Sequence, residues 1–171
     1  MSQENRIKLV KEKCHPFYMD ATNVWEFDGD LVKDFVKGRN VLDIGCGKNG
    51  GLSETVFDMG AESYTGVDID ESFIEQSKKL AKGEFIYDDP VYVLGKVKNQ
   101  PLIISSGVFD SSVLNSWEYS NQLIKAIYEA MKNGDVTLHT SGYVGDYNNA
   151  FLSKGFQVVE KNSMMGIYRK V

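Results

Sequence analysis

The stretch Val41-Leu-Asp-Ile-Gly-Cys-Gly-Lys-Asn-Gly50 decides how the rest of this sequence is interpreted. A short apolar run predicts a buried strand, and the periodicity of residues 52–59 predicts a helix shortly after it. Glycines between a strand and a helix let the backbone turn tightly and let a ligand approach without meeting a Cβ atom. Their spacing matches G-x-G-x-x-G, so this turn is a candidate site for a nucleotide or nucleoside.

Two acidic residues beside the turn refine the kind of ligand. Asp43 precedes the first glycine by two residues, where a carboxylate repels a pyrophosphate and suits a cationic group. Asp68 ends the next predicted strand, residues 63–69, where an acid can accept hydrogen bonds from ribose hydroxyls. The alternative for Asp68 is helix capping, for which Asp70 is better placed. Together the two acids predict a nucleoside ligand with a positively charged tail.

The remaining chain alternates apolar runs with helical patterns, which predicts βαβ units and a largely parallel sheet. The last two strands must be antiparallel because their connection is too short for a crossover. Between 83 and 100 the pattern is ambiguous, since 85–87 suits a strand or a helix end, and 101–104 is the better strand. The other expected helices are 72–81, 121–132 and 148–154, and the other expected strands are 108–114, 136–140, 156–160 and 165–170.

Composition limits the classes of protein that remain. A chain of 171 residues with 42% hydrophobic residues predicts one domain over 1–171, with 1–38 as a helical cap or lid. No apolar run is long enough for a membrane helix, and no signal-like start is present. The net charge of −5 makes a nucleic-acid partner unlikely. Two cysteines, Cys14 and Cys46, fit a reducing cytoplasm, and Cys14-His15 without a second ligand pair predicts no metal site.

In this order, four segments resemble the motifs of the class I S-adenosylmethionine-dependent methyltransferases: Asp43–Gly47, Gly66–Asp70, Val108–Leu114 as a fourth strand, and Met131–Asp135 before a fifth. The resemblance covers residues of about 24–171. It implies an α/β, three-layer Rossmann-like fold whose mostly parallel sheet ends in an antiparallel C-terminal hairpin. It also implies S-adenosyl-L-methionine as cofactor and a methyltransferase activity.

The resemblance assigns site residues one by one. Asp43, Gly45, Cys46 and Gly47 would hold the methionine portion, Asp68 the ribose, Ile69 the adenine, and Asn115 the neighbourhood of the sulfonium and acceptor. The adenine amino group would meet Asp88 or Asp89 if the third strand is 85–87, and Ser105 or Ser106 if it is 102–104. The strand at 102–104 is favoured as the third strand, and Ser106 is favoured with it. One departure is the third glycine, which lies at 50 where the family often has it at 49.

Methyl transfer depends mainly on positioning the nucleophile and excluding water. A base is required only for a protonated acceptor, and Asn115, Glu118 and Asp20 are the sequence's only candidates for catalytic roles. Without a basic face or a further domain, a small molecule or peptide acceptor is favoured over duplex DNA, with a partner subunit or second copy as a possible contributor. Two alternatives remain, an NAD-dependent oxidoreductase and a non-catalytic, degenerate methyltransferase-like module. His139, inside a predicted strand, is interpreted as structural.

Overall fold

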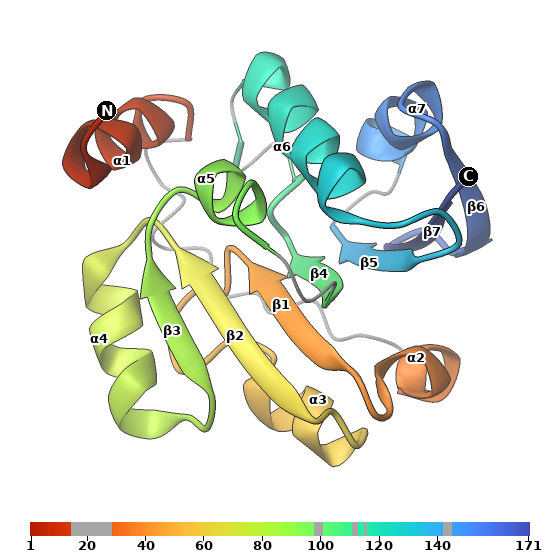
Figure 1. Cartoon of the computed structure of the whole chain (residues 1–171), viewed down its shortest axis with the longest axis horizontal. Coiled ribbons are helices and arrows are strands. Elements are labelled where there is room, and N and C mark those ends of the chain that lie inside the picture. Colours follow the sequence, from red (N-terminus) through yellow and green to blue (C-terminus); the bar gives the residue numbers. More distant parts are fainter. Residues whose placement is uncertain (15–28, 98–100, 111–112, 115, 142–144) are drawn as a thin grey trace.

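One seven-stranded sheet organises the computed structural model, which describes residues 1–14, 29–97, 101–110, 113–114, 116–141 and 145–171 (Figure 1). The strands are β1 (Asn40–Ile44), β2 (Ser63–Asp68), β3 (Glu84–Tyr87), β4 (Leu102–Ser106), β5 (Val136–Thr140), β6 (Phe156–Lys161) and β7 (Met165–Lys170). Their order in the sheet is β3-β2-β1-β4-β5-β7-β6. The first five run parallel, whereas β7 is antiparallel to both β5 and β6. The predicted parallel sheet with an antiparallel C-terminal hairpin is confirmed.

Helices cover both faces of the sheet and complete three layers. One face carries α1 (Gln3–Lys11), α5 (Pro90–Leu94), α6 (Trp117–Ala130) and α7 (Gly145–Ser153), and the other carries α2 (Gly29–Val36), α3 (Ser53–Asp58) and α4 (Glu71–Leu80). Because side chains alternate along a strand, Leu42 and Ile44 of β1 enter one core and Val41 enters the other. A sheet buried on both faces is therefore the frame of the site.

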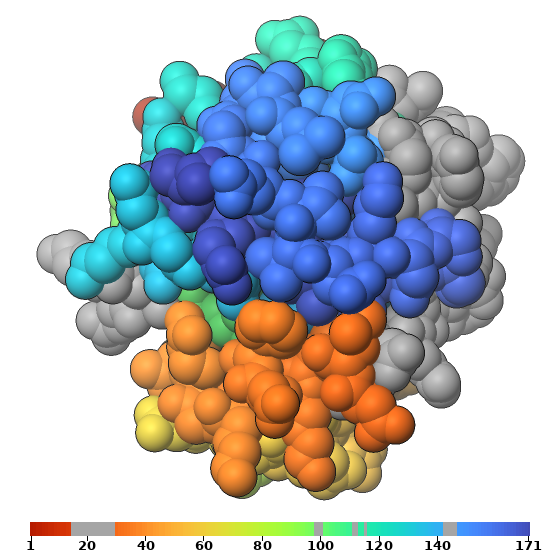
Figure 2. Space-filling view, turned by 90° about the vertical axis from the view of Figure 1, so that its right-hand side faces the viewer, coloured from red at the N-terminus to blue at the C-terminus, as the bar shows by residue number. Residues whose placement is uncertain are grey.

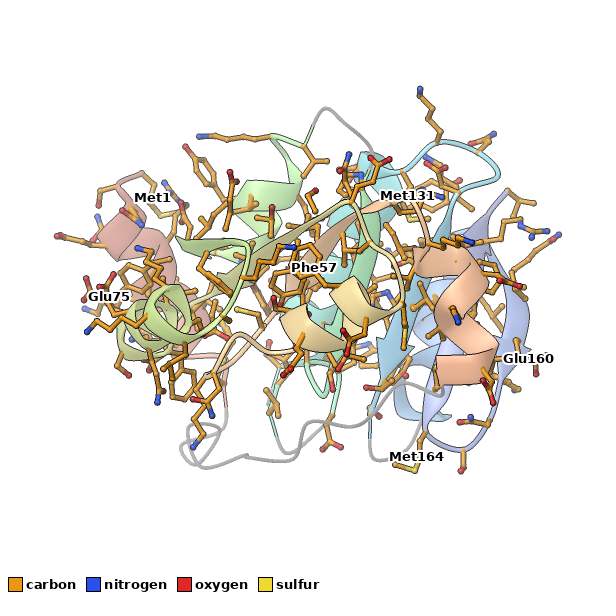
Figure 3. The ribbon with its side chains drawn as sticks, turned by 90° about the horizontal axis from the view of Figure 1, so that it is seen from below. Met1, Phe57, Glu75, Met131, Glu160 and Met164 are labelled. Atoms are coloured by element: carbon orange, nitrogen blue, oxygen red, sulfur yellow. The ribbon has the colours of Figure 1, made fainter. Side chains whose placement is uncertain are left out.

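The N-terminal helix α1 and the C-terminal hairpin of β6 and β7 lie at opposite sides of the molecule (Figure 1). Seen from below, Met1 lies at one side and Glu160 and Met164 lie at the other (Figure 3). On the side opposite α1, the C-terminal residues fill the upper middle of the surface, with residues around α2 below them (Figure 2). The region of α1, β3 and α4 is thus well separated from the C-terminal hairpin.

Two strand predictions are wrong. The third strand is β3, which pairs with β2, whereas the run at 102–104 belongs to β4 and lies beside β1 in the centre of the sheet. The described residues of the expected strand at 108–114, which are 108–110 and 113–114, belong to no strand of the sheet. The chain turns after β4, with the Asp110 amide donating to the Gly107 carbonyl at 3.0 Å, and Phe109 is buried in the core instead. Apolar residues there fill space above the sheet, which gives the same sequence pattern as a buried strand.

The N-terminal region is helical at α1 and α2, as expected, and residues 15–28 lie outside the described part of the chain. Helix α6 begins at Trp117, four residues earlier than predicted. Its start is explained by Ser116, whose hydroxyl accepts a hydrogen bond from the Tyr119 amide at 3.2 Å. This early start brings the first turn of α6 to the carboxyl edge of the sheet.

Candidate cofactor site

The glycine turn after β1 is fixed to the neighbouring strand. The amides of Gly45 and Cys46 both donate to the Val67 carbonyl, at 2.7 and 3.0 Å. Gly45 and Gly47 have φ values of +72° and +66°, which glycine adopts most readily. A Cβ atom on Gly45 would lie 2.2 Å from Cγ2 of Val108, whereas one on Gly47 would meet nothing within 4 Å. Gly45 is therefore needed for packing, and Gly47 leaves open space above the turn.

That open space belongs to a cleft of about 160 Å³ at the carboxyl ends of β1, β2 and β4. In α/β sheets, ligands bind at this edge, where the strand order reverses between two neighbouring strands. Here the reversal lies between β1 and β4, because β2 and β3 continue to one side of β1 and β5 lies beyond β4. The cleft is lined by Val10, Cys14, Gly45, Gly47, Asp68, Ile69, Phe73, Pro90, Ser106, Gly107, Val108, Asp110, Val113, Leu114, Tyr119 and Leu123.

Asp68 is the buried carboxylate of the cleft wall. It is 7% exposed, and its Oδ2 accepts a hydrogen bond from the Gly47 amide at 2.8 Å while its Oδ1 accepts from the Asp70 amide at 2.9 Å. Burial raises the pKa of Asp68 to about 6, against the opposing effect of the two amides. The carboxylate is thus fixed beside the turn and charged at neutral pH, which suits a hydroxyl-bearing ligand.

Asp43 lies beneath the turn and supports it. The carboxyl is 1% exposed, and its Oδ2 accepts a hydrogen bond from the Tyr64 hydroxyl at 2.7 Å. Its Oδ1 is buried without a hydrogen-bond partner among the described residues. Burial raises the pKa of Asp43 to about 7. An unpaired buried oxygen is costly, so Asp43 is an acceptor that a donor or a positive charge near the turn would stabilise.

The other predicted cofactor residues divide into two groups. Ile69 and Ser106 line the cleft together with Gly45, Gly47 and Asp68. Cys46 instead packs in the core on the α3 and α4 face, 5% exposed, and burial raises the pKa of its thiol well above the usual range. A thiol in this state is not a nucleophile, as expected from sequence.

None of the three candidates for catalytic roles is among the described residues that line the cleft. Asn115 and Asp20 lie outside the described residues. Glu118 lies in the first turn of α6, exposed, with one oxygen 3.4 Å from Nε2 of Gln122, and it is not among the residues that line the cleft. The residues that directly follow β4 are Gly107 to Asp110, and of these Gly107, Val108 and Asp110 line the cleft.

The four candidates for the adenine contact have different surroundings. Because the third strand is β3, Asp88 and Asp89 are the acids that follow it. Asp88 pairs with Arg6, and Asp89 accepts a hydrogen bond from the Tyr119 hydroxyl at 2.7 Å. Ser106 lines the cleft, whereas Ser105 is fully buried below the sheet edge. The sequence preference for the serine strand as strand three was wrong, although Ser106 does reach the cleft.

Ser105 is part of a hydrogen-bonded network that confirms His139 as a structural residue. Its Oγ lies 2.7 Å from His139 Nδ1, and Thr137 Oγ1 lies 2.8 Å from His139 Nε2. Thr137 donates its proton to the Ile103 carbonyl, so it accepts from Nε2–H, and Nδ1 accepts from Ser105. The fully buried ring is therefore neutral, and burial lowers its pKa to about 3.

Sequence reasoning missed the walls that come from distant helices. Val10 and Cys14, at the end of α1, and Tyr119 and Leu123 of α6 line the cleft. The spacing of Ile7 and Val10 is a signal for one buried helix face, but it does not reveal what that face covers, and Cys14 lies beyond the end of the helix. Within the described ranges, no group of three or more His, Cys, Asp or Glu residues could hold a metal ion. The described helices also include none with the length and apolar character to span a membrane.

A glycine turn after β1, a carboxylate at the end of β2 and a cleft at the strand switch together define a Rossmann-like nucleoside-binding protein. The sequence profile of the family described as "Methyltransferase domain" matches residues 42–138, more than half of the chain. The chain therefore belongs to the class I S-adenosylmethionine-dependent methyltransferases, and this membership decides against the NAD-dependent alternative.

Individual relatives agree with this family. The ribosomal protein L11 methyltransferase of Shewanella piezotolerans is 31% identical over 125 residues, which cover 71% of this chain and 41% of that protein. The chain thus spans about two fifths of the length of this curated relative. A TehB-like S-adenosylmethionine-dependent methyltransferase from Corynebacterium glutamicum superimposes with a TM-score of 0.63 at 15% identity, covering 99% of this chain and 98% of its own.

A third relative is a T. thermophilus 16S rRNA N2 G1207 methyltransferase solved with S-adenosylmethionine and guanosine. It has a TM-score of 0.63 at 18% identity, covering 88% of this chain and 45% of its own. At such identities the two structural relatives show a shared fold. The residues of the cleft fit the family's cofactor, because Asp68 can accept hydrogen bonds from ribose hydroxyls and Gly47 leaves room for a ligand.

Proposed function

We propose that this protein transfers a methyl group from S-adenosyl-L-methionine to an acceptor in the cleft above Gly45–Gly47. Bound S-adenosylmethionine supplies an electrophilic methyl group on a positively charged sulfur. The observation that carries the proposal is that the open space at Gly47 lies directly beside the Asp68 carboxylate, which the Gly47 amide holds in place. Asp68 would bind the ribose hydroxyls, and the walls from α1 and α6 would exclude water from the reacting atoms.

The charge of the cleft supports a cationic ligand. Among the described residues that line it, the charged ones are Asp68 and Asp110, and none is a lysine or arginine. A carboxylate attracts a positive sulfonium in a partly buried site and repels a phosphate tail. The raised pKa of Asp68, about 6, still leaves this carboxylate charged at pH 7. The same charges disfavour a pyrophosphate-containing dinucleotide.

For the acceptor, we propose a small molecule or a peptide rather than duplex DNA. The net charge is −5, and the described cleft wall carries no cation that would neutralise a phosphate backbone. The named relatives act on a ribosomal protein and on rRNA, so the acceptor class has to be tested directly. We further propose one domain over 1–171, with 1–38 as a cap, because α1 lines the cleft, and a cytoplasmic location, because both cysteines are free thiols.

Calorimetric titration with S-adenosylhomocysteine, S-adenosylmethionine and NAD tests the cofactor proposal. We expect the two adenosyl ligands to bind and NAD not to bind. Asp68→Ala should lower the affinity for S-adenosylhomocysteine by roughly 10- to 100-fold, because hydrogen bonds to a charged group contribute about 1.5–3 kcal/mol each. Binding of NAD alone would contradict the proposal.

Two glycines provide a matched pair of variants for the same titration. Gly47 and Gly38 have φ values of +66° and +70°, and a Cβ atom on either would meet nothing within 4 Å. Alanine should therefore impose a similar backbone strain at both positions, but only Gly47 lines the cleft. We expect Gly47→Ala to lose affinity and Gly38→Ala to keep it. Equal losses in both variants would show that strain, not the cleft, determines binding.

Methyl transfer itself is tested with labelled S-adenosylmethionine and fractionated small-molecule, peptide and RNA pools. Label in the small-molecule or peptide pool supports the proposed acceptor class, and label confined to RNA overturns it. Tight binding of the cofactor with no labelled product in any pool would favour the non-catalytic alternative.

A further inference from the structure

Helix α1 forms part of the wall of the cofactor cleft, although it lies far from the glycine turn in sequence. Val10 of α1 and Cys14, three residues after the end of α1, line the cleft together with Gly45 and Gly47. Cys14 also makes an isolated antiparallel bridge with Leu114, which lines the same cleft. The shape of the cleft therefore depends on how α1 is held against the sheet edge.

Arg6 provides the main polar attachment of α1. Its Nε and Nη2 donate to Oδ1 of Asp88 at 3.2 and 2.9 Å, and Nη2 also contacts Oδ2 at 2.8 Å. The two side chains are only 10% and 12% exposed. The guanidinium also lies 3.5 Å from the ring centroid of Tyr92, a residue of α5. Gln3, one turn earlier in α1, donates to the Tyr87 carbonyl at the end of β3. Buried arginine–carboxylate pairs of this kind fix geometry well.

Both oxygens of the Asp88 carboxylate take part in these contacts. Oδ1 accepts from Arg6 and from the Asp89 amide, and Oδ2 accepts from Arg6. Asp88 lines a separate groove beside Tyr92 and is not among the residues that line the cofactor cleft. The next acid, Asp89, accepts from the Tyr119 hydroxyl at 2.7 Å and caps α5 through the Val91 amide at 2.9 Å. Both acids after β3 thus attach helices that border the cleft.

We propose that Arg6 is a positioning residue of the cofactor site: with Asp88 it fixes α1 as a wall of the cleft, and Asp88 thereby does not read the adenine amino group. This inference rests on the proposed function, since it requires the cleft to bind the adenosyl cofactor. It differs from the assignment that the family resemblance gives to an acid after strand three. Base recognition is left to the groups that do line the cleft.

Affinities for two bases test this inference. S-adenosylhomocysteine and S-inosylhomocysteine differ at the 6-position of the purine, where an amino group is replaced by a carbonyl. We expect Arg6→Met and Asp88→Asn each to lower the affinity for both ligands by about tenfold or more. The ratio of the two affinities should stay within about twofold of the wild-type ratio. The double variant should be no worse than either single variant, because both remove one interaction. Arg6→Lys should restore part of the affinity.

Lys8→Met is the matched control, since Lys8 is exposed on the same helix, and it should bind as the wild type does. All titrations are made at a temperature where circular dichroism shows each variant folded. A change of tenfold or more in the base preference of Asp88→Asn would overturn the inference, and so would wild-type affinity in Arg6→Met. Failure of the wild type to bind either ligand would instead contradict the proposed function.

Discussion

The buried carboxyl of Asp43 gives the protein a specific dependence of stability on pH. Burial raises its pKa from 3.8 to about 7. Between these values the folded protein holds the proton more tightly than the unfolded chain does. The stabilising contribution is therefore complete below about pH 4 and is lost as the pH rises through about 7. A shift of this size corresponds to about 4 kcal/mol.

Asp43→Asn removes this titration and keeps an oxygen that can accept from the Tyr64 hydroxyl. We expect the free energy of unfolding of the variant, relative to wild type, to increase by about 4 kcal/mol between pH 4 and pH 8. Urea unfolding followed by circular dichroism at several pH values measures it, and the difference between the two proteins cancels most other titrating groups.

Asp34→Asn makes the same change in charge at an exposed site on α2 and is the control for the loss of one carboxylate. If the difference in free energy of unfolding between Asp43→Asn and wild type changes by less than about 1 kcal/mol from pH 4 to pH 8, burial does not raise the pKa of Asp43 and the prediction is refuted.

Three further outcomes are expected. His139→Leu should cost about 1–3 kcal/mol at pH 7, because hydroxyls on both sides of the ring lose their partner. Because the pKa of His139 is about 3 in the folded wild type, the wild type loses stability as the pH falls below 6.5. The variant should lose less over the same range, as measured by urea unfolding. Tyr119→Phe should lower the free energy of unfolding by about 1 kcal/mol through the lost bond to Asp89, and an unchanged thermal midpoint would contradict this. S-adenosylhomocysteine affinity should fall by up to about tenfold per pH unit below pH 6, where Asp68 becomes protonated, and an Asp68→Asn variant should not show this fall.

Local patterns predicted most of the fold. The β1 and β2 strands and the glycine turn follow from apolar runs next to glycines, and β7 occupies the predicted residues. The order of motifs also predicted Gly45, Gly47, Asp68 and Ile69 as parts of one site, and all of them line the cleft. Neighbouring parallel strands end at one edge, so residues at their ends meet without further information.

Errors arose where one pattern has two structural causes. The run around Phe109 is as apolar as a buried strand, yet it fills the core above the sheet end. At β3, an edge strand with one side chain buried, periodicity is too weak to identify it. The contribution of α1 could not be predicted, because Arg6 and Asp88 are 82 residues apart and only the folded chain brings them together.

The placement of β7 between β5 and β6 has a consequence for protein synthesis. On the ribosome β6 is complete before β7 exists, yet β6 pairs with β7 and not with β5. At roughly 5–20 residues per second, β6 must wait on the order of a second for its partner to be synthesised. Until β7 is made, the edge of β5 that β7 covers in the folded sheet has no strand beside it. The last part of this sheet to be translated is therefore an inner strand. A nascent chain that stalls before β7 would lack this inner strand rather than an edge strand.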